Sequence, residues 1–190
     1  EKQGIPHLYF TGCAGNITAG KYNDGVADNR DLFTGRIHDA MVASEESMRR
    51  SPISSLRWAV EEICLPPRED LDEATLLSEI AATASSPKVE SKAALMLTYL
   101  RRRESPIPVT CLQINHDVAI VHLPGETFIE YQLHAQAVRP DAFVAVAGYG
   151  DLGTGYITLK QSFSEGGYEP VDAFVSGESE AILRHAIERV

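Results

Sequence analysis

The amino-acid sequence predicts an α/β fold in which helices pack on a mixed β-sheet. Runs of β-branched and aromatic residues of strand length recur along the chain, and segments with apolar residues at helical spacing lie between them. The two kinds of segment do not alternate strictly, which favours a sheet with both parallel and antiparallel neighbours. The 190 residues, of which 44% are hydrophobic, are enough for a single domain over residues 1–190 with its own core.

The N-terminal third is expected to contain a strand, a loop and a long helix. Residues 7–11 form a short apolar run, and a loop of small residues follows it. Asp28 is a favourable N-cap residue, and Phe33, Ile37 and Met41 then recur at helical spacing. A helix from 29 to about 49 is therefore expected.

The middle of the chain predicts one strand and a helical hairpin that leaves the sheet. Trp58 and Val60 alternate with other residues over 53–65, as in a strand, and two prolines end that run. Apolar stripes at helical spacing then pass through 69–84 and 88–103, with a Ser-Ser-Pro break between them. These segments are expected to pair as a helical hairpin near residues 69–103.

The C-terminal half is expected to complete the sheet. β-Rich runs at 107–114 and 118–123 flank a polar turn, which is typical of a β-hairpin. The remaining expected elements are a helix from about 127 to 138, a strand at 143–147, a short extended segment at 156–159 and a helix at 178–190. Glycine-bearing loops are expected at 148–155 and 164–170.

The composition excludes two classes of partner. The chain has 17 Lys and Arg against 27 Asp and Glu, a formal net charge of −10, and its longest basic run is Arg101-Arg102-Arg103. Such a charge balance does not neutralise phosphates, so no nucleic acid partner is expected. No apolar run approaches the ~18 residues of a membrane span, so no integral membrane segment is expected.

The chain opens without an initiator Met or an apolar leader, as a segment of a longer catalytic domain would.

Cys13 is one candidate for chemistry. The three cysteines are too widely spaced for a disulfide framework or a metal knuckle, which favours small buried residues. Cys13 nevertheless lies in a small-residue loop after the first predicted strand. It could act as a nucleophile if a base such as His7 or His38 lay nearby.

Glu126 is a second candidate, because it follows a Pro-Gly turn at the mouth of a predicted helix. The carboxylate is either a metal ligand or a first-turn acid that favours the helix dipole. Glu126, Glu130 and His134 are spaced four residues apart and would share one helix face. That face is either a metal-binding pair or a solvated stripe.

Three segments, in this order, resemble the neutral/alkaline non-lysosomal ceramidase family. Residues 9–18 resemble the family's strand and Gly-Asp loop, and residues 123–128 its Pro-Gly-Glu turn. Residues 153–158, with Phe163 and the stretch 166–169, resemble its Tyr-Ile/Val-Thr-Thr segment and downstream Tyr-Glu. The resemblance spans most of the chain, and these patches are its specific part.

This resemblance implies a zinc-dependent amide hydrolase that cleaves the N-acyl bond of a sphingolipid such as ceramide. The family holds zinc (Zn2+) with two His, one Glu and one Tyr, and by motif position the Glu is Glu126 and the Tyr is Tyr156. The family's two histidines precede the Gly-Asp loop, where this chain has only His7. The resemblance therefore implies a ligand upstream of residue 1, with the upstream part of its own chain as a partner and a lipid amide as substrate. It also suggests a secreted or periplasmic location.

The family's serine-bearing catalytic loop is altered in this chain. Gly12 occupies the serine position, Cys13 the following asparagine position and Asn16 the aspartate position. Two hypotheses follow from this change. Either the chain is a ceramidase-like zinc hydrolase that works without the serine, or it is a catalytically inactive ceramidase-like domain that binds a lipid or a glycan.

Overall fold

The structure, a computed structural model, describes residues 4, 6, 8–20, 23–82, 87–150 and 153–190. The chain divides into two compact units. One unit comprises Glu1–Ile17 and Leu56–Val190, and the other is Thr18–Ser55. The first contains the sheet and the candidate site, and the second contains one long helix.

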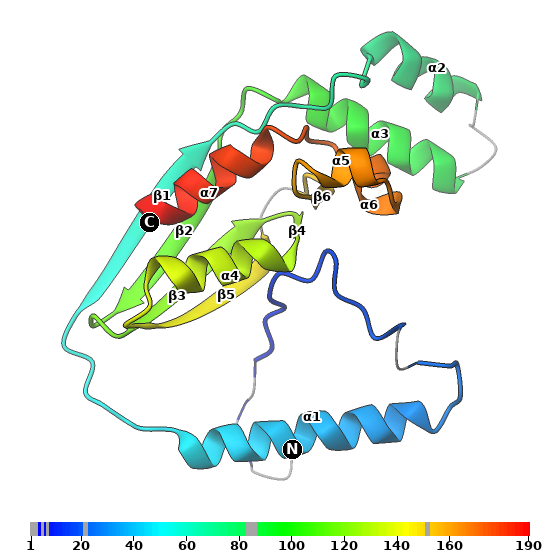
Figure 1. Ribbon diagram of the computed structural model, residues 1–190. Helices are drawn as coiled ribbons and strands as arrows, with labels where there is room; N and C mark the ends of the chain where they lie inside the picture. The colour runs from blue at the N-terminus through cyan, green and yellow to red at the C-terminus, as the bar shows by residue number, and fades with distance from the viewer. Residues whose placement is uncertain (1–3, 5, 7, 21–22, 83–86, 151–152) are drawn as a thin grey trace. The chain divides into compact units, whose positions relative to one another are not determined.

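A four-stranded mixed sheet in the order β1-β2-β3-β5 forms the centre of the larger unit (Figure 1). Its strands are β1 (Leu56–Ile63), β2 (Ile107–Ile114), β3 (Val118–Pro124) and β5 (Phe143–Gly150). The β1–β2 and β2–β3 pairs are antiparallel, and the β3–β5 pair is parallel. The predicted mixed α/β fold and the β2–β3 hairpin are therefore confirmed.

One face of this sheet is covered by α4 (Ile129–Val138) and α7 (Ser179–Arg189), which lie on the same side of the strands (Figure 1). Alternate residues of the three strands β2, β3 and β5 are buried; they are Val109, Cys111, Ala119, Val121, Val144 and Val146. Leu183 of α7 and Tyr131 of α4 are both fully buried. The core of the larger unit includes this two-layer packing.

The opposite face of the sheet carries several exposed apolar side chains. Leu56, Trp58 and Val60 of the edge strand β1 are 65%, 61% and 50% exposed, and Phe143 of β5 is 70% exposed. The strand register places Trp58 beside Leu112, and Leu112 beside Ile120, so these side chains form one surface. We call Leu56, Trp58, Val60, Ile120 and Phe143 the open sheet face.

The predicted helical hairpin is confirmed by α2 (Glu73–Ala82) and α3 (Pro87–Arg101), which pack against each other. Leu76 of α2 is buried, as are Ala93, Met96 and Leu97 of α3. The helix interface is thus apolar, as the sequence pattern requires.

The parts of the chain around the candidate site differ from the prediction in four places. The strand expected at 143–147 continues to Gly150 in β5, into the loop expected at 148–155. The helix expected from 127 begins at Ile129, because Glu126 and Thr127 form β4 (Glu126–Thr127), which pairs in parallel with β6 (Tyr156–Ile157). The loop expected at 164–170 overlaps two short helices, α5 (Ser162–Glu165) and α6 (Tyr168–Asp172). The strand expected at 7–11 is absent from its described residues, 8–11. One backbone bond, from Gly148 N–H to the Thr11 carbonyl (2.8 Å), is too little for a ladder.

The smaller unit contains α1 (Asn29–Ser47), close to the predicted bounds. Asp28 makes no side-chain capping bond to it, and no residue of α1 is buried. Ile37 and Met41 are 62% and 54% exposed. In the described part of the chain, none of the helices has the length and hydropathy of a membrane span.

Candidate active site

The Pro-Gly-Glu turn fixes the position of Glu126. Gly125 has a φ of +64°, a left-handed conformation that side chains disfavour. A Cβ on Gly125 would lie 2.2 Å from Thr154 Oγ1, so no larger residue fits there. The turn therefore brings β4 directly against the chain segment that leads into β6.

Glu126 and Tyr156 are neighbours across the two-stranded sheet. They are Cα partners in the parallel register of β4 and β6. Glu126 N–H donates to the Gly155 carbonyl at 3.0 Å, and Phe128 N–H donates to the Ile157 carbonyl at 3.3 Å. The two residues that the sequence comparison singled out as metal ligands thus come from adjacent strands and lie side by side.

Two further tyrosines complete a polar cluster around this pair. The Tyr149 hydroxyl donates to Glu126 Oε1 at 3.1 Å. The hydroxyl oxygens of Tyr156 and Tyr168 are 3.3 Å apart, and the two rings meet edge to face with centroids 5.6 Å apart. We call Glu126, Tyr149, Tyr156 and Tyr168 the tyrosine–glutamate cluster.

The surroundings raise the pKa of Tyr149 and of Tyr156. Burial raises the pKa of Tyr156 well above its ordinary value, and the hydrogen bond with Tyr168 and the charge of Glu126 raise it further. Burial and the hydrogen bond to Glu126 raise the pKa of Tyr149 to about 12. At neutral pH the Tyr149 and Tyr156 side chains therefore keep their hydroxyl protons.

The loop that carries Gly12, Cys13 and Asn16 packs against the same segment. Gly15 N–H donates to the Thr127 carbonyl at 2.9 Å. Asn16 Oδ1 accepts from Ile129 N–H at 2.8 Å, and its Nδ2 donates to Glu130 Oε2 at 2.9 Å. Asn16 thus caps α4 from a distant part of the sequence, and the loop lies next to Glu126 and Thr127.

Gly12 and Cys13 are held tightly in this loop. A Cβ on Gly12 would lie 2.4 Å from Gln132 Oε1, the same oxygen that accepts the Cys13 N–H at 3.1 Å. Cys13 is 3% exposed, and the Thr127 hydroxyl donates to its sulfur at 3.0 Å. Burial raises the pKa of the Cys13 thiol and outweighs the hydrogen bond from Thr127 to its sulfur, so the thiol form dominates.

The helix-face pairing of Glu126, Glu130 and His134 is not formed. Glu126 precedes α4 as part of β4. Glu130 binds Asn16, and His134 Nε2 is 3.3 Å from Glu188 Oε1 on α7. Within the described ranges, no group of three His, Cys, Asp or Glu residues could hold a metal ion. His7 lies outside the described residues, and His38 belongs to the other unit.

Sequence reasoning did not assign a role to Tyr149 or Tyr168. Tyr168 lies within the 166–169 stretch that resembles the ceramidases, so its motif was visible while its contact with Tyr156 was not. Tyr149 lies in the predicted glycine-rich loop, and its φ of 58° is rare for a bulky residue. Strands and helices are predicted from the spacing of apolar residues. That spacing does not reveal a single tyrosine in a left-handed conformation beside glycines.

No protein-family model matches the chain, and no curated protein matches it. Among solved structures, the chain is similar to neutral ceramidase from Pseudomonas aeruginosa, with 16% identity and a TM-score of 0.39. It is also similar to a structure described as ceramidase complexed with C2, with 15% identity and the same TM-score. Each likeness covers 44% of this chain and 14% of the ceramidase chain.

Proposed function

We propose that this chain carries part of the site of a ceramidase-like, metal-dependent hydrolase that acts on an amide bond. The observation that carries the proposal is the register pairing of Glu126 with Tyr156. The motif resemblance names these two residues as zinc ligands without reference to any structure. The fold brings them together from positions 30 apart in the sequence.

The donor set fits a zinc ion in part. Carboxylate oxygen is an ordinary zinc donor, and a phenolate becomes one when a cation lowers its pKa. Tyr156 has to release its proton to bind a metal, and burial, Tyr168 and Glu126 now hold that proton in place. In this proposal Glu126 and Tyr156 are the oxygen ligands, and the family pattern supplies two histidines as the remaining ones.

The roles of the chain's own residues follow from their contacts. Glu126 would supply the negative charge of the site, with Tyr149 orienting its carboxylate. Tyr168 would orient the Tyr156 hydroxyl. Bound zinc would polarise the amide carbonyl and make water a better nucleophile.

The loop of Gly12, Cys13 and Asn16 would form a wall of this site. It replaces the family's serine loop, and the buried Cys13 thiol favours a water nucleophile over a covalent step. Its substrate would be a sphingolipid N-acyl amide or a related lipid amide.

Zinc binding tests the ligand assignment. The protein, produced together with the upstream part that the proposal takes to supply the remaining histidine, is stripped of metal, and its zinc affinity is measured by competition with a chromogenic chelator. Glu126→Gln and Tyr156→Phe should each weaken zinc binding by at least about tenfold, since each removes a charged ligand. Glu165→Gln, which changes an exposed carboxylate on α5, is the matched control. Unchanged affinity in both site variants would refute the assignment.

Hydrolysis tests the reaction class. The zinc-loaded protein is incubated with a fluorogenic N-acyl sphingosine, and release of the acyl group is followed. Zinc-dependent turnover that falls in Glu126→Gln supports the proposal. Zinc binding at Glu126 and Tyr156 without turnover would favour the inactive, lipid- or glycan-binding alternative.

A further inference from the structure

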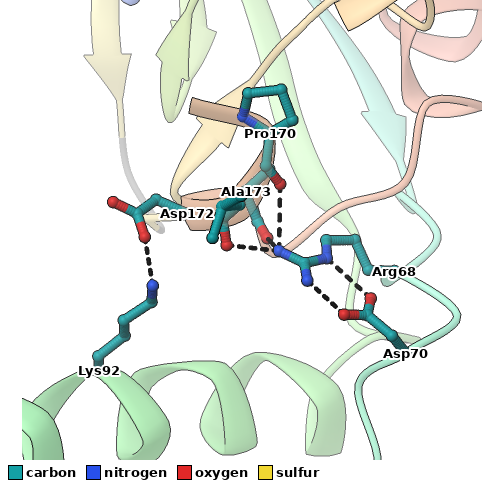
Figure 2. A network of polar contacts seen from close by, with 7 residues as sticks. Arg68, Asp70, Lys92, Pro170, Asp172 and Ala173 are labelled. Carbon is teal, nitrogen blue, oxygen red and sulfur yellow. Dashed lines mark hydrogen bonds and ion pairs between the residues drawn. The ribbon is translucent and has the colours of Figure 1, made fainter. Parts of the chain in front are cut away.

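Arg68 binds the end of α6 through its guanidinium group. Its Nη1 donates to the carbonyls of Pro170 (3.1 Å), Val171 and Ala173 (3.2 Å), while Nε donates to Asp70 at 2.8 Å (Figure 2). The arginine side chain is only 17% exposed. The last carbonyls of a helix have no hydrogen-bond partner within the helix. Here one arginine donates hydrogen bonds to the carbonyls at the end of α6.

The chain around Arg68 is also joined to the chain after α6. Arg68 N–H donates to the Phe174 carbonyl at 3.0 Å, and Ser176 N–H donates to the Pro66 carbonyl at 2.8 Å. Lys92 of α3 forms an ion pair with Asp172, the last residue of α6 (Figure 2). Contacts with the residues that follow β1 and with α3 of the helical hairpin therefore fix the C-terminal end of α6.

The first residue of α6 is Tyr168, whose hydroxyl meets that of Tyr156. The last residue of α6 and the residues after it contact the segment that precedes Tyr156. Phe174 N–H donates to the Thr154 carbonyl at 3.2 Å, and a Cβ on Gly155 would lie 2.7 Å from the Asp172 carbonyl oxygen. The part of the chain that Arg68 holds therefore contacts Tyr156 directly through Tyr168, and contacts its preceding residue, Gly155.

We propose that Arg68 is a positioning residue for the Tyr156–Tyr168 pair. It touches neither hydroxyl and acts by holding α6 in place. A fork of five N–H donors can bind three carbonyls and a carboxylate together, which a single ammonium cannot do. This inference rests on the proposed function only in taking Tyr156 as a residue of the site.

Hydrogen exchange followed by mass spectrometry tests the placement without any metal or substrate. In Arg68→Gln, peptides covering 153–158 and 168–175 should exchange at least about tenfold faster, while peptides of β2 and β3 stay protected. Arg68→Lys should give an intermediate increase, because it keeps the charge and loses the fork. Arg101→Gln breaks the exposed Arg101–Glu73 pair of the helical hairpin and should leave both segments unchanged.

Two outcomes would overturn the proposal. Unchanged exchange at 153–158 in Arg68→Gln would show that Tyr156 does not depend on Arg68. Equally faster exchange over the whole sheet would make Arg68 a contributor to global stability alone. If Arg68→Gln does not fold, Arg68→Lys carries the same comparison.

Kinetics give a second readout where the protein hydrolyses an N-acyl amide. Misplaced groups cost rate more than binding, so Arg68→Gln should lower kcat by about ten- to a hundredfold with KM little changed. A change confined to KM would contradict the positioning role. A wild-type protein that hydrolyses no N-acyl amide would contradict the proposed function. The hydrogen-exchange experiment would still decide the role of Arg68.

Discussion

The three cysteines show how burial alone can separate chemically identical side chains. Cys13 and Cys111 are 3% and 2% exposed, whereas Cys64 is exposed. Burial raises the pKa of both buried thiols. A thiol with a raised pKa and no access to solvent is a packing residue, which is the structural role that its size also allows.

This difference predicts one reactive thiol in the folded protein. With an aromatic disulfide reagent, Cys64 should react at least about a hundredfold faster than Cys13 and Cys111, and all three should react together in denaturant. Cys64→Ser should remove the fast phase, and Cys13→Ser should leave it intact. Fast native labelling of Cys13 would contradict its burial and revive a nucleophilic role.

Tyr149 predicts a loss of stability at alkaline pH. Its pKa is raised from 10.0 to about 12 in the folded protein, so the folded state holds the proton more tightly than the unfolded state. The resulting stabilisation is complete below pH 10 and is lost as the pH rises through about 12. The stability difference between the wild type and Tyr149→Phe, from urea unfolding at each pH, should shrink across this window. A difference that stays constant would contradict the prediction.

At the scale of elements, α4 depends on a capping residue that is far away in sequence. Its own N-cap residue, Phe128, offers no side-chain acceptor, and Asn16 supplies one instead. The cap joins the loop of Gly12, Cys13 and Asn16 to the helix that follows Glu126. The same contact therefore stabilises the helix and sets one wall of the candidate site.

Removing this cap should destabilise the protein without changing its fold. Asn16→Ala should lower the free energy of unfolding by about 1 kcal/mol, the usual value of an N-cap side chain. Asn16→Asp keeps the acceptor for Ile129 N–H and places a second negative charge near Glu130, so a smaller loss is expected. Urea unfolding followed by circular dichroism measures both. An Asn16→Ala variant as stable as the wild type would show that water replaces the cap.

Local patterns were sufficient to predict the elements that have a strong period or a clear boundary. The β2–β3 hairpin, the α2–α3 pair and α7 follow from alternating or helical spacing between turn residues. The strand expected at 7–11 is wrong because an apolar run becomes a strand only where a neighbouring strand can pair with it. Glu126 was expected at a helix start, and its pairing with Tyr156 moves it into β4 instead.

The candidate site was predictable only in part for the same physical reason. Glu126 and Tyr156 were identified through short motifs, which can be recognised because the residues of each motif are contiguous in the sequence. Tyr149, Tyr168 and Arg68 act through contacts whose partners lie 12 to 105 residues away. No spacing rule connects such residues, since the turn at Gly125 and the course of α6 decide which of them meet.

At the scale of the whole molecule, the larger unit has a sheet with one covered face and one open face. The open sheet face contains Trp58, the only tryptophan of the chain. Trp58 is 61% exposed and lies in the edge strand of the central sheet. Exposed apolar surface of this extent is unusual for a sheet that has a helical layer on its other side.

Trp58 fluorescence reports directly on this face. In dilute solution its emission should be that of a hydrated indole, and acrylamide should quench it nearly as well as free tryptophan. Trp58→Ala should cost less than about 1 kcal/mol of stability, because little buried area is lost. Leu183→Ala, at a fully buried position of α7, should cost about 2–5 kcal/mol. A blue-shifted, unquenched emission would contradict the exposure of this face.

The loop around Asn16 also has a consequence for how the protein is made. Asn16 and its partner Ile129 are 113 residues apart. Ribosomes add about 5–20 residues per second, so the segment that binds the loop is synthesised on the order of ten seconds after the loop itself. Until then Gly15 and Asn16 have no backbone or helix end to bind, so the wall of the candidate site is assembled late. Conditions that slow elongation between these residues should therefore prolong exposure of the N-terminal segment to chaperones and proteases.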